Sequence, residues 1–445
     1  MNSSNITQCN RDINSAIASK IVNKSVQAFR EYCAVSHSGR EMIVSAIKEA
    51  LIPLVPEIAE MERAETGMGC TEDKEKKLLL ALQKTPGSED LMPGAAMADD
   101  GIALFEYFAY GVICATQPAT NPCATTINNV IGMVCAGNSV VIISHPRSLN
   151  VSQYLVSHIN AAIIAVSGID NLVMTLEQSS LLLAVEVMGH PDVAMVVATG
   201  GGKLIKQALS CSKRVIAAGA ANPVAMVDET ADLACAAKNI SDGAAFNHNI
   251  SCVGEKNIVV VSKVADALVK ALKENGVHYI SDYGDMLKLT KVVIDNNFMM
   301  NRSLAGKSAN EILDAAEIQA EAGIRLIVVE TPKIHPFVST EMLMPLVPLV
   351  KTDDFEDMLE TALFIEHGHR HTATIHSQNI ARLNRAAQFM QTAVFVKNGS
   401  AISALGFDGG AHAGFTIANI TGEGIVTAKN FARRRRCLQK TGDFS

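Results

Sequence analysis

The apolar positions near the start of the chain recur at helical spacing. Between residues 13 and 33, isoleucines stand at every fourth position and a second apolar row runs beside them, which predicts an amphipathic helix. Further helices are predicted over residues 38–50, up to Thr66, and from Thr71, where acidic residues in the first turn complement the positive end of the helix. The first hundred residues are therefore expected to be mostly helical.

From about residue 102, short runs rich in Val and Ile alternate with helical segments. The predicted strands of this series are residues 110–116, 139–144, 171–176, 193–199 and 214–218. Buried apolar strands that alternate with helices are typical of a parallel sheet covered by helices on both faces. We predict a doubly wound α/β domain here, of the type that binds nucleotides.

A second α/β series begins near Val224. Its predicted strands are residues 224–228, 257–261, 325–330, 346–351, 372–376 and 393–397. The segment Gly219–Pro223, with the sequence GAANP, interrupts the pattern. We therefore place a domain boundary there and expect two doubly wound α/β domains in all.

The composition is that of a globular protein, since 48% of the 445 residues are hydrophobic and 19% are charged. The net charge is -7 with both signs interspersed, so no basic stripe favours nucleic acid. The longest apolar run, Leu181–Met188, is interrupted by Glu186 and is too short to span a bilayer. No signal peptide precedes the ten cysteines and none are paired as CxxC, which predicts a reducing, cytoplasmic setting without membrane contact.

One cysteine stands in a setting that differs from the others. Cys252 is the centre of residues 246–256, FNHNISCVGEK, a predicted loop between a Gly-containing approach and a strand. A thiol presented on a loop by rigid elements invites a catalytic interpretation. A buried structural cysteine is the favoured interpretation on this stretch alone, because free cysteines are among the most buried residues.

Three further motifs have a functional and a plain interpretation. TGGGK at residues 199–203 follows a strand and opens a helix, which suits either a bound anion or a tight turn. His367, His369 and His371 alternate as zinc ligands on a strand would, but their neighbours favour a loop, and no metal site is predicted. Arg433–Arg436 is expected to be a solvated or interface face.

A series of short motifs shares its order and spacing with one enzyme family. They are ETGMG (65–69), TNP (120–122), INN (127–129), AGN (136–138), TGG (199–201), NPVAMVDETADL (222–233), FNHNISCVGEK (246–256), HPF (335–337), TEMLMP (340–345), HTATIHS (371–377), FVKNG (395–399) and TGEG (421–424). Over residues 13–437 the sequence resembles the CoA-acylating aldehyde dehydrogenases, in particular the acetaldehyde and propionaldehyde dehydrogenases of ethanolamine and propanediol catabolism.

The resemblance implies a role for Cys252 that composition alone does not. In the family, the thiol at this position attacks the aldehyde, and an oxyanion develops on the carbonyl oxygen. Asn121 matches the family's side-chain donor, which acts with the backbone N–H of Cys252. Hydride transfer to NAD then leaves a thioester on the enzyme.

The fate of the thioester separates two branches of the family. Hydrolysing members carry a Glu in an ELGG segment, where it activates water as a general base. The matching segment here, Ile216–Asn222 (IAAGAAN), has no acidic side chain. CoA is therefore the expected acceptor and acyl-CoA the product. The alternatives are a hydrolysing enzyme that forms the free acid, and an inactive relative that serves as an assembly partner.

The resemblance also implies where NAD is bound. Glu341 matches a carboxylate that contacts the nicotinamide ribose, and six further residues match the cofactor site: Thr120, Ser144, His145, Thr199, Gly200 and Gly201. The strand that ends at Ser144 and His145 lacks the Lys that many relatives carry near the adenosine ribose. NADP stays open, but NAD is favoured because we expect no phosphate-binding Arg or Lys at that strand end.

The family's architecture implies an NAD-binding domain over residues 1–222, with bridging strands near 100–116, and a catalytic domain over 223–420. A small oligomerisation segment over 421–445 would complete a homodimer or homotetramer. Some relatives carry an N-terminal extension that directs them into a bacterial microcompartment. About nine residues precede the first core-like helix here. We therefore expect a cytoplasmic enzyme, or one that reaches a microcompartment through a partner protein.

Overall fold

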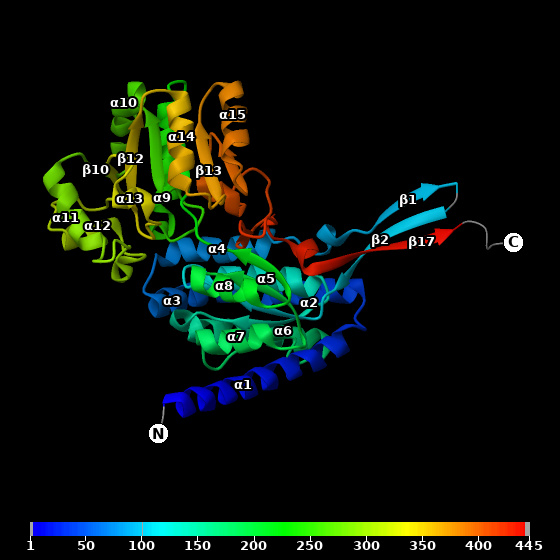
Figure 1. Ribbon diagram of the computed structural model, residues 1–445. Coiled ribbons are helices and arrows are strands. Elements are labelled where there is room, and N and C mark those ends of the chain that lie inside the picture. The colour runs from blue at the N-terminus through cyan, green and yellow to red at the C-terminus, as the bar shows by residue number, and fades with distance from the viewer. Residues whose placement is uncertain (1–2, 100, 441–445) are drawn as a thin grey trace. The chain divides into compact units, whose positions relative to one another are not determined.

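The computed structural model describes the backbone of residues 3–99 and 101–440, and side chains from residue 12 onward. Two compact units divide the chain (Figure 1). Unit 1 comprises residues 1–65, 77–218 and 412–445, and unit 2 comprises residues 66–76 and 219–411. Each unit is built around its own parallel sheet.

Unit 1 is centred on a five-stranded parallel sheet in the order β5-β4-β3-β6-β7. Its strands are β3 (Val112–Thr116), β4 (Ser139–Ile143), β5 (Val173–Thr175), β6 (Val193–Thr199) and β7 (Arg214–Ala218). Every residue of β3 and β4 is buried, as the continuous apolar runs predict. The chain moves outward from β3 to β5 and then returns to β6, so the strand order reverses between β3 and β6. Ligands of doubly wound sheets bind at such a point, beyond the carboxyl ends of the strands.

Helices α1 (Ser3–Tyr32), α5 (Pro122–Cys135), α6 (Leu149–Ser167), α7 (Leu181–Gly189) and α8 (Gly202–Ser210) pack against this sheet. The other helices of this half of the chain are α2 (His37–Leu51), which packs on α5 and α6, α3 (Val55–Thr66) and α4 (Thr71–Lys84). Ala18 and Val22 of α1 pack with α7 in one apolar cluster. Helix α1 begins at Ser3 rather than near residue 13, because the polar residues that precede the amphipathic pattern also adopt helical backbone.

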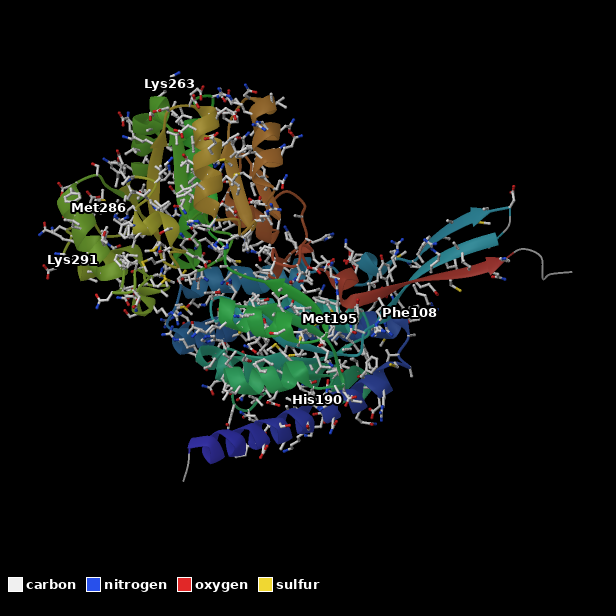
Figure 2. All side chains as sticks on the ribbon, in the orientation of Figure 1. Phe108, His190, Met195, Lys263, Met286 and Lys291 are labelled. Carbon is white, nitrogen blue, oxygen red and sulfur yellow. The ribbon has the colours of Figure 1, made fainter. Side chains whose placement is uncertain are left out.

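Unit 1 also contains an antiparallel sheet, of which only β2 (Gly101–Ala109) lies within the strands predicted near residues 100–116. The sheet consists of β1 (Gly94–Ala98), β2 and β17 (Ala432–Lys440). All residues of β1 are exposed, so this segment lacks the alternation that marks a half-buried strand. The four arginines of β17 lie over aromatic rings, and the Arg435 guanidinium is 3.9 Å from the ring centre of Phe108, which is labelled in Figure 2.

Unit 2 contains a seven-stranded parallel sheet in the order β10-β11-β12-β9-β8-β13-β14. Its strands are β8 (Val224–Val227), β9 (Asn257–Val261), β10 (Val277–Ile280), β11 (Leu326–Glu330), β12 (Leu346–Thr352), β13 (Thr372–His376) and β14 (Val394–Lys397). Helices α9 (Leu233–Ala245) and α10 (Ser262–Lys273) pack on one face, and α14 (Phe355–Glu366) and α15 (Ile380–Met390) pack on the other. The remaining helices are α11 (Tyr283–Val293), α12 (Ala309–Ala315) and α13 (Pro336–Ser339).

The units and the predicted domains divide the chain differently. Residues 66–76 group with unit 2, because the N–H of Gly69 donates to the Gly306 carbonyl at 2.9 Å and neighbouring residues bond to Asn247. The predicted separate segment over 421–445 instead groups with unit 1 from residue 412 onward. There, Thr421 Oγ1 accepts a hydrogen bond from the Ala217 N–H at 3.0 Å. Of the strands in the range near 100–116 that was expected to bridge the domains, β3 is the central strand of the parallel sheet of unit 1 and β2 belongs to its antiparallel sheet.

One segment contradicts the expectation that no apolar run is long enough to span a bilayer. Residues Pro146–Ser167 are long and apolar enough by length and composition alone. The core helix of a soluble protein passes the same test. In unit 1 this segment forms α6, whose Val151, Leu155 and Ile159 side chains are buried.

Candidate active site

Cys252 lies in unit 2 on the loop that joins α9 to β9, at the amino edge of the sheet. The three residues of the preceding turn, Asn247, His248 and Asn249, have φ values of 49°, 52° and 55°. Such left-handed backbone is uncommon outside glycine, and it clusters at functional sites because the surrounding structure must enforce it. The Cys252 side chain is half-buried.

Two residues of the segment 69–73 form hydrogen bonds with this turn. The carboxylate of Asp73 accepts the Asn247 N–H at 2.7 Å, and the Asn247 side-chain oxygen accepts the Cys70 N–H at 3.1 Å. Gly69 has a φ of 73°, and a Cβ added there would lie 2.0 Å from the Asn247 Oδ1. Gly69, the second glycine of the ETGMG motif, is therefore needed for the close approach of these two segments.

The fully buried Lys256 also forms hydrogen bonds with the turn. The Nζ of Lys256 donates to Asn249 Oδ1 at 2.7 Å and to the Ser251 carbonyl oxygen at 3.1 Å, and it also donates to the Asn249 carbonyl oxygen. The Asn249 amide Nδ2 in turn donates to the Glu255 carbonyl oxygen at 3.0 Å. One ammonium group therefore hydrogen-bonds to two residues, Asn249 and Ser251, of the loop that carries Cys252.

Burial and neighbouring charges shift the pKa values of Lys256 and Glu341 in opposite directions. Burial lowers the pKa of Lys256, while the negative charges of Glu341, Cys252 and Glu255 oppose that change. Burial raises the pKa of Glu341, whereas Lys256 and an N–H from Ala221 act to lower it. Glu341 and Cys252, two of the predicted site residues, therefore share Lys256 as a neighbour within unit 2.

Glu255 is a buried acid in the same loop. Its Oε1 accepts the Ala401 N–H at 2.8 Å, and the residue is fully buried. Burial raises the pKa of Glu255 to about 8, although the hydrogen bond from Ala401 opposes this. The carboxyl group is therefore largely uncharged at neutral pH.

The histidines that resembled a zinc pattern do not share one strand. His367 caps α14 in left-handed backbone, and only His371 adjoins β13. Among the described residues, no group of three or more His, Cys, Asp or Glu could hold a metal ion. His371 is buried, and its pKa is lowered to about 3 by burial, by His369 and by Lys256. It is a neutral imidazole within electrostatic reach of Lys256, a feature that the sequence pattern did not reveal.

In unit 1, Asn121 stands at the start of α5 without capping it through its side chain. The buried ammonium of Lys77 donates to Asn121 Oδ1. Because an ammonium can only donate, this contact fixes the orientation of the amide and directs Nδ2 away from Lys77 as a donor. Thr120, immediately before Asn121, belongs to the same loop beyond β3.

The other predicted cofactor residues of unit 1 follow the carboxyl ends of β4 and β6. At the point where the strand order reverses, the Oγ1 of Thr116 in β3 accepts the Thr199 N–H of β6 at 3.1 Å. Gly201 precedes α8, and a Cβ added to Gly201 or Gly202 would meet nothing within 4 Å. The backbone at this helix start is therefore open to a pyrophosphate, so the residues present fit a dinucleotide such as NAD.

A cation lies close to the strand end at Ser144 and His145. Arg147 is exposed in the short helical turn Pro146–Ser148, and its N–H donates to His145 Nδ1 at 3.1 Å. Arg147 lies two residues beyond His145, and the absence of a phosphate-binding Arg or Lys at this strand end stays a prediction. The pKa of His145 is lowered by burial and by Arg147.

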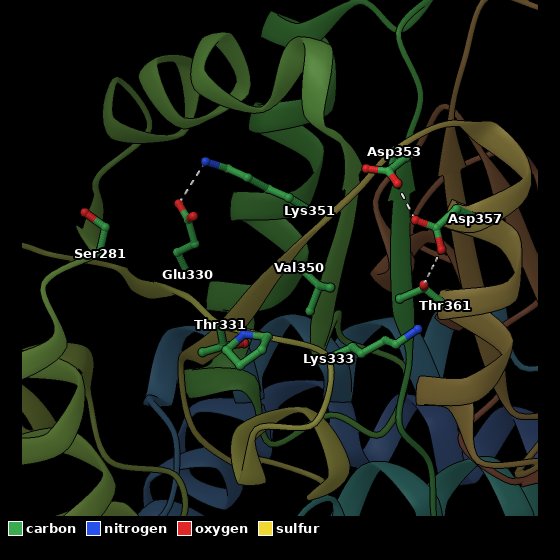
Figure 3. Close-up of a pocket in the computed structure, with 10 residues that line it drawn as sticks. Ser281, Glu330, Thr331, Lys333, Val350, Lys351, Asp353, Asp357 and Thr361 are labelled. Atoms are coloured by element: carbon green, nitrogen blue, oxygen red, sulfur yellow. Dashed lines mark hydrogen bonds and ion pairs between the residues drawn. The ribbon is translucent and has the colours of Figure 1, made fainter.

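A cavity of about 540 Å³ lies at the opposite, carboxyl edge of the unit 2 sheet (Figure 3). It is lined by Ser281, Glu330, Thr331, Pro332, Lys333, Val350, Lys351, Asp353, Asp357 and Thr361. Several of its charges are internally paired, since Lys351 binds Glu330 at 3.1 Å and Asp357 accepts the Asp353 N–H at 3.0 Å. Because Cys252 precedes β9 and lies at the other edge, this cavity is not the site of the thiol chemistry.

Comparison with known proteins gives a family assignment. The aldehyde dehydrogenase family model matches residues 2–424. The chain belongs to the aldehyde dehydrogenase family. The resemblance drawn from the motifs is confirmed, and so is the aldehyde-dehydrogenase-like α/β fold.

Curated relatives of this aldehyde dehydrogenase place it near the acylating members. The CoA-propanoylating propanal dehydrogenase of Salmonella typhimurium is 42% identical over 425 residues, which cover 95% of this chain and 91% of the relative. The acetylating acetaldehyde dehydrogenase EutE of Escherichia coli K12 is 38% identical over 406 residues, which cover 90% of this chain and 86% of the relative.

Solved structures agree with this placement. The propionaldehyde dehydrogenase of Rhodopseudomonas palustris with bound propionyl-CoA matches with a TM-score of 0.94 and 41% identity, and 95% of this chain and 94% of that chain are covered. A propionaldehyde dehydrogenase from the fucose utilisation microcompartment of Clostridium phytofermentans matches with a TM-score of 0.93 and 37% identity, and 96% and 98% are covered.

Proposed function

We propose that this aldehyde dehydrogenase oxidises a short-chain aldehyde, propionaldehyde or acetaldehyde, and transfers the acyl group to CoA. NAD is the proposed hydride acceptor and Cys252 the nucleophile. The observation that supports Cys252 most strongly is its loop, in which three consecutive non-glycine residues are held in left-handed backbone beside a buried ammonium. Strain of this kind persists only where surrounding contacts enforce it.

The first step is attack of the Cys252 thiolate on the aldehyde carbon, which forms a carbon–sulfur bond and moves the carbonyl electron pair onto oxygen. The Cys252 N–H and the Asn121 amide Nδ2 are the proposed donors to that oxyanion. NAD, when bound, accepts the hydride whose departure leaves a thioester. Thr199, Gly200 and Gly201 would hold its pyrophosphate, Thr120, Ser144 and His145 would line the site, and Glu341 would contact the ribose.

The second step is attack on the thioester by the CoA thiolate, which expels the Cys252 thiolate and gives acyl-CoA. The CoA thiol gives up its proton to solvent before the attack, because His371, whose pKa is lowered to about 3 by burial, is too weak a base to take it at neutral pH. Water is the disfavoured acceptor, since Ile216–Asn222 has no acidic side chain to activate it. The nearby acid Glu255 is fully buried and bonded to the Ala401 N–H.

Steady-state turnover tests this proposal against the hydrolysing alternative. Propionaldehyde and NAD should give sustained NADH formation only when CoA is present, with propionyl-CoA as product. Equal NADH formation without CoA, with propionate as product, would favour the hydrolysing enzyme, and no turnover under any condition would favour an assembly partner. Comparing aldehydes of two to four carbons would then assign the substrate.

We also propose a homodimer or homotetramer that assembles through the antiparallel sheet containing β17. Strand β17 is exposed over residues 433–440 and carries four consecutive arginines. A cytoplasmic location, with recruitment to a microcompartment through a partner, fits the relative from a fucose utilisation microcompartment. Light scattering of the purified chain, and of a variant lacking residues 433–440, would test the assembly.

A further inference from the structure

Lys256 is a buried cation whose position is set by the loop around it. Its side chain is fully buried, and burying an ammonium group is costly unless oxygen atoms replace the lost water. Three oxygens do so here: both oxygens of Asn249 and the carbonyl oxygen of Ser251. All three lie on the chain just before Cys252, so the charge is bonded to the segment that carries the thiol.

The contact with Ser251 determines the orientation of the next N–H group. The Ser251 carbonyl oxygen faces Lys256 Nζ at 3.1 Å and also accepts the Gly254 N–H at 3.2 Å. The described residues contain no cis peptide bond. In a planar trans peptide the C=O and N–H groups point in opposite directions, so the Cys252 N–H is directed away from Lys256. The ammonium thereby fixes the direction of the backbone donor that belongs to Cys252.

Asn249 contributes a second attachment. Its side chain lies against Gly254, where an added Cβ would be 2.6 Å from Asn249 Oδ1. The amide spans the loop, because Oδ1 accepts from Lys256 and Nδ2 donates to the Glu255 carbonyl. Removing the ammonium would leave two buried oxygens of Asn249 without this donor and would release residues in left-handed backbone.

The charge of Lys256 also acts on the thiol directly. The groups that interact with it electrostatically are Cys252, Glu255, Glu341 and His371. His371 is neutral at physiological pH, and Glu255 is largely protonated. A cation near a cysteine favours the thiolate over the thiol.

We propose that Lys256 is a positioning residue of the acyl-transfer site, whose ammonium directs the Cys252 N–H toward the oxyanion and holds the Cys252 sulfur as a thiolate. This inference rests on the proposed role of Cys252 as the nucleophile. Lys256 does not itself bond to the substrate in this proposal; it acts through the Ser251–Cys252 peptide and through its charge.

The test measures Cys252 alkylation by iodoacetamide as a function of pH, in the full-length protein without aldehyde or CoA. The Cys252 peptide is quantified by mass spectrometry, so the other cysteines do not contribute to the signal. Lys256→Met should raise the midpoint of the profile by about one pH unit or more, which corresponds to roughly tenfold slower alkylation near neutral pH. It should also lower kcat about tenfold or more with a smaller change in the KM for aldehyde.

Two further variants control the result. Lys263→Met removes an exposed lysine of α10 and should leave the profile and kcat unchanged (Figure 2). Lys256→Arg retains the charge with a different donor geometry, so its midpoint should stay within about half a pH unit of the native value while kcat falls. If Lys256→Met does not fold, Lys256→Arg decides: a native kcat would overturn the positioning role, and a midpoint raised by a full unit would overturn the charge effect.

A folded Lys256→Met protein with a native alkylation profile and native kcat would overturn the whole inference. Cys252→Ala separates this outcome from failure of the proposed function. If Cys252→Ala retains turnover, the nucleophile itself was assigned wrongly. If Cys252→Ala is inactive while Lys256→Met behaves like the native enzyme, only the role of Lys256 is wrong.

Discussion

The carboxylate of Asp73 accepts the backbone N–H of Asn247 at 2.7 Å, although 174 positions separate the two residues in the sequence. The same carboxylate pairs with Lys76 at 2.8 Å and accepts the Cys70 thiol hydrogen at 3.3 Å. Burial raises the pKa of Asp73, but the contacts with Lys76 and Asn247 outweigh it and leave the pKa lowered. Asp73 is thus an ionised anchor for the turn that precedes Cys252.

Asp73→Asn should lower kcat about tenfold and destabilise the protein by about 1–2 kcal/mol, because the Asn247 N–H then bonds to a neutral acceptor and the ion pair with Lys76 is lost. Since the folded pKa lies below the unfolded value, this stabilisation is present above the unfolded pKa and disappears as the pH falls through the folded one. Steady-state kinetics would measure the change in kcat. Urea unfolding at pH 7 and in acid would measure the change in stability and its dependence on pH. Asp266→Asn, at a side chain that is 98% exposed, is the control and should change neither quantity.

Gly69 and Gly67 offer a matched pair, since both have positive φ but only Gly69 is crowded. Gly67→Ala should cost about 1 kcal/mol from backbone strain alone. Gly69→Ala should cost clearly more and should lower kcat, because its Cβ would displace the Asn247 side chain. Thermal unfolding and steady-state kinetics compare the two variants, and equal effects would show that contact with Asn247 is unimportant.

Glu255 should make stability depend on pH. Its folded pKa of about 8 lies above the unfolded value, so the folded protein binds the proton more tightly and loses stability as the pH rises between the two values. Glu255→Gln removes this titration. Between pH 5.5 and 8.5 its unfolding free energy should therefore rise relative to the native protein by about 3 kcal/mol. Glu274→Gln, at an exposed position, should track the native protein, and a native-like pH dependence of Glu255→Gln would contradict the argument.

Asn121→Ala should reduce kcat by about 10²–10³-fold if its amide stabilises the oxyanion. The KM for NAD should change little. Lys77→Met should give a smaller loss in kcat, because it frees the amide to rotate rather than removing it. An Asn121→Ala enzyme with native kcat would exclude Asn121 from this role.

The parts of the fold predicted correctly are those with a strong local signal. Strands β4, β6, β7 and β9 match the predicted runs to within one residue, because buried parallel strands are continuous in Val and Ile. The antiparallel strands β1 and β17 were missed, since they are largely exposed and β17 pairs with residues far apart in sequence, whereas β2 lies within the strands predicted near 100–116. Helix α11 was missed because only Leu289 and Val293 of its residues are buried, which leaves a weak periodic pattern.

The candidate site shows the same division. The loop of Cys252 could be found from its motif, but the anchoring of Asn247 by Asp73 could not, because it depends on contacts between distant segments. The burial of Lys256 and His371 was equally hidden, since charged and imidazole side chains are usually assumed to be exposed. The roles of Cys252, Asn121 and Glu341 stay predictions that the experiments here address.

The most direct test of the account is a single-turnover measurement without CoA. The enzyme is mixed with propionaldehyde and NAD, NADH is followed at short times, and the quenched protein is digested for mass spectrometry. We predict a burst of about one NADH per active site, no further turnover, and a propionyl group on Cys252 that disappears as propionyl-CoA when CoA is added. Continued NADH formation with propionate as product, or a propionyl group on another cysteine such as Cys70, would contradict the assignment of Cys252 as the acyl carrier to CoA.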